Sequence, residues 1–235
     1  MKTIITIAGI LYASITFAQN CTCEKQEILS EIIHCDTIRF DNKAKLYWNF
    51  NCDSSWLTFE SPKRVKEIMF SLGDGLHSYT GRLGYDYTQE YKHTFLIRNF
   101  VISGCCDPPE YFLFDKKTGN LKKKLGRVIF YGENKKLPFI IGITNSNYND
   151  TGTKAIYNSL TIYNIDKNET HYVKLPKGEL ENQVRTTETM FPEHLFEEPV
   201  IQGKLIKFTY HIRKAGTSQT ESKKIIIINL EKYSN

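Results

Sequence analysis

The strongest constraint on the fold is a strand-like pattern that recurs four times along the chain. Each unit has a long segment, a polar loop, a second segment ending near an acidic residue or Asn, and a short third segment. In the fourth unit the main segments read KLIKFTYHIR and KKIIIINLEKY. Apolar and polar side chains alternate in residues 45–50, and alternate positions of residues 206–212 are apolar, which is typical of half-buried β-strands. The units, residues 44–72, 93–126, 137–176 and 203–233, therefore predict a β fold.

This pattern predicts an all-β fold of about twelve short antiparallel strands in four approximate meander repeats. The runs YFLF and IIII are apolar at every position, as expected of strands buried between layers. Three-strand units at a spacing of about 50 residues resemble the blades of degenerate β-propeller-like exported proteins. The resemblance covers residues 44–231 at the level of layout and lacks the Trp-Asp pair and regular Gly-rich motif of such blades. A propeller-like arrangement and a two-sheet sandwich both fit.

The N-terminal part predicts a leader peptide followed by a short helix. Residues 1–18 combine Lys2, an apolar stretch and small residues before Ala18, which is typical of a signal peptide. Residues 24–35 place Ile28, Leu29, Ile32 and Ile33 on one helical face, so we expect a short helix packed on a sheet, with an edge strand as the alternative. Residues 19–235 are expected to form one domain.

The same features predict a soluble exported protein, either periplasmic or extracellular. No later segment approaches the roughly 20 apolar residues of a spanning helix. Asn20 stands before Cys21, where a lipid anchor favours a small residue, so we expect no lipid at this cysteine. The net charge of +5 is mild and does not indicate nucleic acid as a partner.

An even number of cysteines in an exported chain indicates disulfides. The six residues are Cys21, Cys23, Cys35, Cys52, Cys105 and Cys106. Equivalent loops of the first two units hold Cys52 and the Cys105-Cys106 pair, so we expect Cys52 to bond to one of these two, with the N-terminal cysteines supplying the remaining partners. A bond between Cys105 and Cys106 is the alternative. The spacings do not match the usual zinc patterns, and we predict neither a metal nor another cofactor.

Two surfaces are candidate binding sites. Residues 73–93 are predicted to form a long loop rich in tyrosine. This loop is either a binding surface, because aromatic and arginine side chains are frequent at binding hot spots, or a connector whose tyrosines cover the edge of the barrel or blade. Residues 116–136 carry a cluster of basic side chains against a single Glu133, which predicts either a solvated face or a footprint for an acidic partner. The acidic residues 179–199, in which residues 192–196 are expected to form a helical turn, complement this hairpin. The candidate binding residues are Tyr79, Arg82, Tyr85, Tyr87, Lys122, Lys123 and Lys124.

Sequence motifs for catalysis are absent. We find no nucleophile elbow, zincin, phosphate loop or EF-hand, and the triplet at 150–152 lacks the second copy that an aspartic protease requires. The favoured function is therefore an exported, non-catalytic binding protein with a protein or glycan partner, of which an immunity-type inhibitor is one variant. The alternatives are a hydrolase acting on glycans through Asp74, Asp86 or Glu90, and a structural component of the envelope.

Overall fold

The structure is a computed structural model that describes residues 21–25, 27–101, 109–132, 137–143, 159–175, 180, 192–213 and 220–234. It is nearly all β and holds four small antiparallel sheets, each built from strands that follow one another along the chain. The expected all-β class and meander order are confirmed. The predicted signal peptide, the Cys105-Cys106 pair and the triplet at 150–152 lie outside the described residues.

Each of the first three sheets has four strands, and the fourth has three. The first sheet contains β1 (Ile38–Arg39), β2 (Lys45–Phe50), β3 (Ser55–Glu60) and β4 (Lys66–Leu72). The second contains β5 (Leu83–Glu90), β6 (Thr94–Val101), β7 (Glu110–Asp115) and β8 (Leu121–Gly126). The third contains β9 (Val128–Tyr131), β10 (Phe139–Ile143), β11 (Ser159–Asn164) and β12 (Glu169–Lys174). The fourth contains β13 (Val200–Gln202), β14 (Leu205–Arg213) and β15 (Thr220–Asn229).

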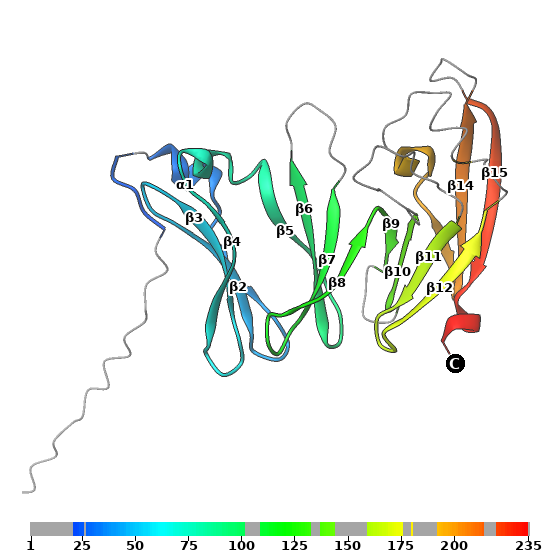
Figure 1. Cartoon of the computed structure of the whole chain (residues 1–235), viewed down its shortest axis with the longest axis horizontal. Helices are drawn as coiled ribbons and strands as arrows, with labels where there is room; N and C mark the ends of the chain where they lie inside the picture. Colours follow the sequence, from blue (N-terminus) through cyan, green and yellow to red (C-terminus); the bar gives the residue numbers. More distant parts are fainter. Residues whose placement is uncertain are drawn as a thin grey trace, which may run out of the picture.

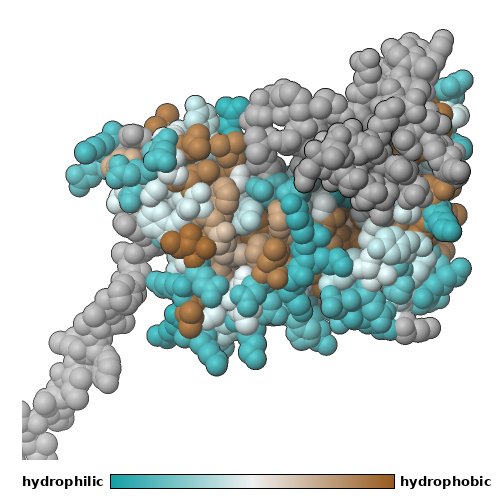
Figure 2. All heavy atoms as spheres, in the orientation of Figure 1, coloured by the Kyte–Doolittle hydropathy of each residue, from teal (hydrophilic) through white to brown (hydrophobic). Residues whose placement is uncertain are grey.

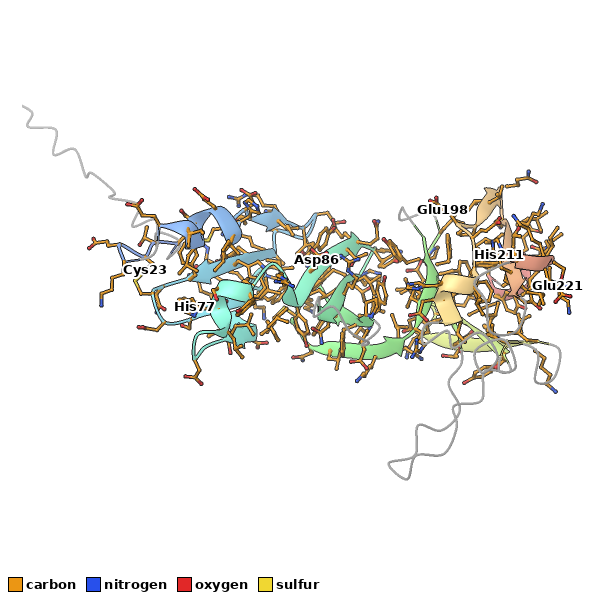
Figure 3. All side chains as sticks on the ribbon, turned by 90° about the horizontal axis from the view of Figure 1, so that it is seen from above. Cys23, His77, Asp86, Glu198, His211 and Glu221 are labelled. Atoms are coloured by element: carbon orange, nitrogen blue, oxygen red, sulfur yellow. A yellow bond between two sulfur atoms is a disulfide. The ribbon has the colours of Figure 1, made fainter. Side chains whose placement is uncertain are left out.

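The four sheets stand face to face in a row, with the first and the last at opposite ends (Figure 1). Seen from above, Cys23 and His211 mark these ends (Figure 3). The described strands form no closed barrel, and the layering is sandwich-like. A row of sheets requires each inner sheet to be apolar on both faces, and this explains the uninterrupted apolar runs of the sequence.

Successive residues of one strand show how the inner sheets are buried. On β6, Phe95 and Ile97 join the hydrophobic cluster shared with the first sheet, whereas Leu96 joins the cluster shared with the third sheet. Because neighbouring side chains on a strand point to opposite faces, this one strand contributes to two cores. A further cluster fills the space between the third and fourth sheets. Its members include Ile141, Leu160, Ile162, Ile206, Phe208 and Ile228.

The described residues also form one short α-helix and three 3-10 turns. The expected N-terminal helix is α1 (Ile28–Ile32), which buries Leu29 and, just after its end, Ile33 against Phe50. Ile28 is exposed, so it does not belong to the packed face. The 3-10 turns are η1 (Leu76–Tyr79), η2 (Pro192–Leu195) and η3 (Leu230–Tyr233). The helical turn expected at 192–196 is thus observed as η2.

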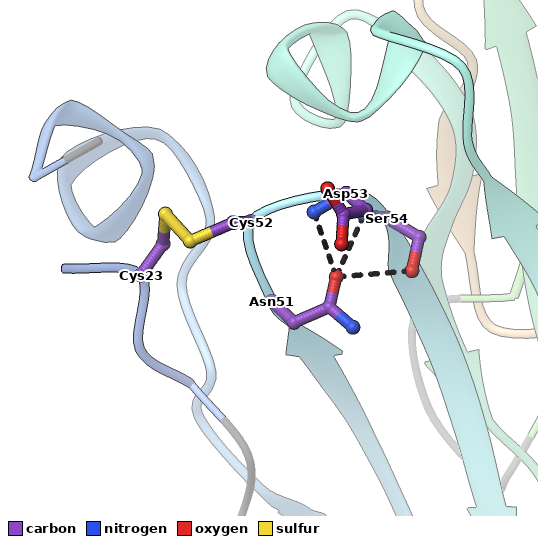
Figure 4. Close-up of a disulfide and its surroundings, with 5 residues drawn as sticks. All are labelled: Cys23, Asn51, Cys52, Asp53 and Ser54. Carbon is purple, nitrogen blue, oxygen red and sulfur yellow. Dashed lines mark hydrogen bonds between the residues drawn. A yellow bond between two sulfur atoms is a disulfide. The ribbon is translucent and has the colours of Figure 1, made fainter. Parts of the chain in front are cut away.

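Of the two disulfides, one closes a loop within the N-terminal segment and the other ties this segment to the first sheet. They join Cys21 to Cys35 and Cys23 to Cys52. The expected bond from Cys52 to Cys105 or Cys106 is therefore wrong, because Cys52 bonds to the segment that precedes α1. Figure 4 shows why this loop can present Cys52: the side-chain oxygen of Asn51 accepts the backbone N–H groups of Asp53 and Ser54, both at 2.8 Å. That arrangement fixes a tight turn beside the disulfide.

The outer face of the first sheet points away from the second sheet. It carries polar side chains that hydrogen-bond to one another within β2 and β3. Glu60 accepts hydrogen bonds from Lys45 at 2.9 Å and from the Tyr47 hydroxyl at 3.3 Å. The Asn49 amide donates to the Thr58 hydroxyl at 3.0 Å. The hydrogen bond from Lys45 is the main reason why the pKa of Glu60 lies below its ordinary value. This set of residues is the polar ladder of the first sheet.

Candidate functional site

An open cleft lies where the turns of the first two sheets meet, at the lower edge of the molecule in Figure 1. Its volume is about 860 Å³. Four turns contribute to its wall: those between β1 and β2, β3 and β4, β5 and β6, and β7 and β8. Figure 2 shows mainly hydrophilic residues along this edge. The exposed cations of the lining are Lys63, Lys92, Lys117 and Lys122, and we call this site the lysine cleft.

The turn between β7 and β8 has the local structure that its sequence predicts. One carboxylate oxygen of Asp115 accepts the backbone N–H groups of Lys117 and Thr118, at 2.8 and 2.9 Å. Gly119 has a φ of +80°, and a Cβ at this position would lie 2.5 Å from the ring of Phe59. Asp and Gly commonly take these two roles in turns, because Asp accepts backbone N–H groups and Gly adopts a positive φ without strain. The turn therefore holds Lys117 at a fixed place on the cleft wall.

Lys116 forms the floor of the lysine cleft and joins three of its turns. The side chain is only 2% exposed, and its ammonium donates to Asp41 at 2.5 Å and to Glu90 at 2.7 Å. The backbone carbonyl of Lys116 accepts from the Asn42 amide at 2.7 Å, and its N–H donates to the carbonyl of His93 at 2.9 Å. Lys116 is therefore a buried structural cation, unlike the exposed members of the lysine-rich hairpin.

The three successive lysines of β8 point to different surroundings. Lys122 lines the cleft. The Lys123 ammonium donates to the Thr170 hydroxyl at 2.8 Å and lies 4.2 Å from the ring centre of Tyr163, and burial lowers the pKa of this lysine. Lys124 forms an ion pair of 2.9 Å with Glu110. The three lysines are adjacent in the sequence, but in the structure they do not form one basic patch.

The region predicted as a tyrosine-rich loop is largely regular structure, because residues 83–90 form β5. Tyr85 stacks on Phe70 with ring centres 4.7 Å apart, and burial raises its pKa. Tyr87 packs against the same cluster, 6.1 Å from the ring centre of Phe40. Both rings therefore fill the space between the first two sheets.

Tyr79 and Arg82 are exposed beside η1. This turn lies at the upper edge of the sheets in Figure 1, opposite the lysine cleft. The four tyrosine and arginine candidates therefore do not form one surface, and their role in binding stays a prediction.

The carboxylates considered for a hydrolase stand in separate places. Asp86 forms an ion pair of 2.9 Å with Arg98, whereas Glu90 contacts the buried Lys116. Asp74 has a φ of +49° in the turn before η1.

Sequence reasoning missed Lys63 and Lys92, because they come from different turns whose meeting depends on how the first two sheets pack. The signal for them was positional, since Lys63 lies between the apolar segments of the first unit and Lys92 directly precedes the second unit. The acidic segment does reach the basic hairpin at one point: Arg127 and Glu193 form an ion pair of 2.9 Å.

No protein family, curated protein or solved structure matches this chain. Among the described residues, no cluster of His, Cys, Asp and Glu side chains could hold a metal ion. The helices that the structure describes are all too short or too polar to cross a membrane.

Proposed function

We infer that this chain is an exported, non-catalytic binding protein whose lysine cleft receives an acidic segment of a partner protein. The observation that carries this proposal is the cleft itself, in which four exposed lysines surround a floor fixed by Lys116. The lining also holds two carboxylates, Glu67 and Asp115, so the lysines are in excess, and a concave surface with an excess of one sign of charge attracts ligands of the opposite sign. The two disulfides are typical of exported proteins and support this location.

The construction of the cleft supports binding rather than chemistry. Its cations come from turns that are held in place by backbone hydrogen bonds, so little order has to be created when a ligand binds. Exposed Pro62 and Val65 lie beside the lysines and offer apolar contact, which suits a protein segment better than a bare anion. An immunity-type inhibitor that covers an acidic region of another enzyme would use such a site.

The experiment measures anisotropy of a labelled polyglutamate peptide at low and at moderate salt. The variant Lys117→Ser with Lys122→Ser should bind at least about tenfold more weakly, and salt should weaken the wild type more than the variant. The matched control, Lys204→Ser with Lys207→Ser, removes the same charge from exposed positions of the fourth sheet. An equal loss in both variants would mean that only net charge acts and would contradict the proposal. If a sulfated glycan binds more tightly than the peptide, the proposed partner is a glycan and not a protein segment.

A further inference from the structure

The fourth sheet leaves open a position that a strand occupies in each of the other sheets. In the first three sheets a fourth strand, β4, β8 or β12, pairs antiparallel with the third strand. In the fourth sheet β14 and β15 form the corresponding long central pair, and β15 is an edge strand. No described residue pairs with the far edge of β15, which is the longest strand of the fold at ten residues.

The register shows which backbone groups face this open edge. Ile226 pairs with Phe208 and Ile228 with Ile206, and in continuation of this register the N–H of Leu230 donates to the carbonyl of Lys204 at 2.9 Å. The even-numbered residues of β15 therefore direct their N–H and C=O groups toward β14. The odd-numbered residues direct theirs toward the open edge. From residue 223 to the end of β15 these are Lys223, Ile225, Ile227 and Asn229.

The side chains of the same residues make the edge apolar. Ile225 is 56% exposed and Ile227 is 64% exposed, on the face of the sheet that points away from the third sheet. Figure 2 shows hydrophobic residues at this end of the row. Proteins usually protect a long edge strand with charged residues, prolines or a bulge. In β15 the charged residues lie in its first half, and residues 225–228 are all isoleucine.

We propose that β15 pairs with β15 of a second copy of this chain, antiparallel and about a two-fold axis through Ile226. Ile225 then lies opposite Ile227 of the second copy, and Lys223 lies opposite its Asn229. Both residues of each such pair face the open edge, so their N–H and C=O groups can exchange hydrogen bonds. The result is one continuous sheet of six strands with four isoleucines clustered at its centre, an isologous interface as two-fold symmetry requires.

The sequence of β15 favours this register over its neighbours. Moving the axis by one residue toward the start of β15 sets Lys223 opposite Ile227, and moving it further sets two lysines opposite each other. Moving it toward the end sets Ile225 opposite Asn229. Among the residues that face the open edge, the axis at Ile226 forms two pairs of Ile225 with Ile227, whereas each neighbouring axis pairs one isoleucine with itself. The axis at Ile226 also leaves no like charges opposite each other between Lys223 and Asn229, which favours this arrangement of cross-strand pairs.

This pairing is independent of the proposed binding function, because the lysine cleft lies between the first two sheets and β15 lies at the far end of the row. A dimer would present two clefts facing away from the shared sheet. Two linked sites increase the apparent affinity for a partner that can engage both.

The first test is analytical ultracentrifugation of the mature protein over a wide concentration range. The mean mass should rise with concentration toward that of a dimer, and Ile227→Lys should weaken association at least about tenfold. The matched control is Ile68→Lys, because Ile68 is also 64% exposed and lies on β4, an edge strand at the opposite end of the row. This control should associate like the wild type. A protein that stays monomeric throughout, or a control that loses association equally, would overturn the proposal.

The second test reads the register and does not depend on the stability of the lysine variant. Ile225→Cys and Ile227→Cys chains are prepared separately, mixed and oxidised, with the wild type showing the background from native cysteines. The mixture should form a cross-linked dimer, because paired Cα atoms lie about 5.5 Å apart. Each variant alone should cross-link poorly, because its two cysteines are offset by two residues, about 6.6 Å along the strand. Equal cross-linking in all three samples would exclude this register.

Discussion

The first and fourth sheets stand at the two ends of the same row, but their outer faces are built in opposite ways. The first sheet has four strands, two disulfides beside it and the polar ladder around Glu60. The fourth sheet has three strands, and its outer face carries exposed isoleucines, together with Val200 and Leu205. Both sheets bury their inner faces in the same manner.

The difference shows how a stack of sheets can end. Polar side chains that hydrogen-bond to one another cover the central strands of the first sheet's outer face, and Ile68 on the edge strand β4 is 64% exposed. The apolar surface left for a further layer or partner is therefore smaller than on the fourth sheet. A face with exposed isoleucines can still gain hydrophobic free energy when association with a partner buries them. The first sheet is thus a closed end of the molecule, and the fourth sheet is an end that can extend.

The largest effect should come from removing the disulfide that supports the closed end. Replacing Cys23 and Cys52 by Ala should lower the free energy of unfolding by about 2 to 5 kcal/mol, because the bond restricts the unfolded chain. Denaturant unfolding measures the loss, and hydrogen exchange locates it. Amide protection should fall in β2 and β3 and persist in β14 and β15. Uniform loss across all sheets would show that the two ends do not differ in this respect.

A smaller effect should come from the polar ladder. Glu60→Gln removes a charged acceptor from Lys45 and should cost about 1 to 2 kcal/mol at neutral pH. The folded pKa of Glu60 is depressed chiefly by the hydrogen bond from Lys45, so its stabilisation is present above the unfolded pKa and is lost as the pH falls through the folded value. The acid branch of the stability curve, measured by urea unfolding from pH 7 to pH 3, should be flatter in the variant.

Glu197 of the fourth sheet is the control for this measurement. Hydrogen bonding from Lys223 lowers its pKa as well, but the pair is exposed, and exposed ion pairs contribute little. Glu197→Gln should therefore change the pH dependence less than Glu60→Gln. A larger change for Glu197→Gln than for Glu60→Gln would contradict the proposed difference between the outer faces of the first and fourth sheets.

The smallest effect on stability should come from the open end. Ile225→Thr with Ile227→Thr should change the free energy of unfolding by less than about 0.5 kcal/mol under monomeric conditions, because exposed positions on a strand tolerate such changes. Thermal melting in dilute solution measures this. A loss of several kcal/mol would mean that these side chains are packed within one copy, and the fourth sheet would then be closed as well.

The fold class could be predicted because the spacing of apolar residues reports the burial of each strand face. Residues 111–114 are apolar throughout because β7 lies between two cores, and residues 45–50 alternate because β2 belongs to an end sheet. The disulfide partners could not be predicted in this way. Cys52 bonds to Cys23 because the chain before α1 lies beside the end of β2, where Cys21 bridges to Phe50, and no pattern of apolar residues encodes that path.

The site could be predicted only in part, for a related reason. A run such as Lys122–Lys124 is visible in the sequence, but the side chains of a strand alternate and meet different neighbours. The lysine cleft instead gathers single lysines from separate turns, and which turns meet depends on how the sheets pack. The tyrosines of β5 resembled a recognition loop because aromatic residues serve both binding and packing.

The pairing of every described strand only with its neighbours along the chain bears on how the protein is made. Each sheet draws its strands from one continuous stretch, so its contacts are short in sequence and cost little loop-closure entropy. A sheet can therefore form as soon as its own segment has emerged, before the rest of the chain exists. Each finished sheet then offers an apolar face on which the next can assemble, and β15, which comes last, has no later sheet in the described chain to cover it.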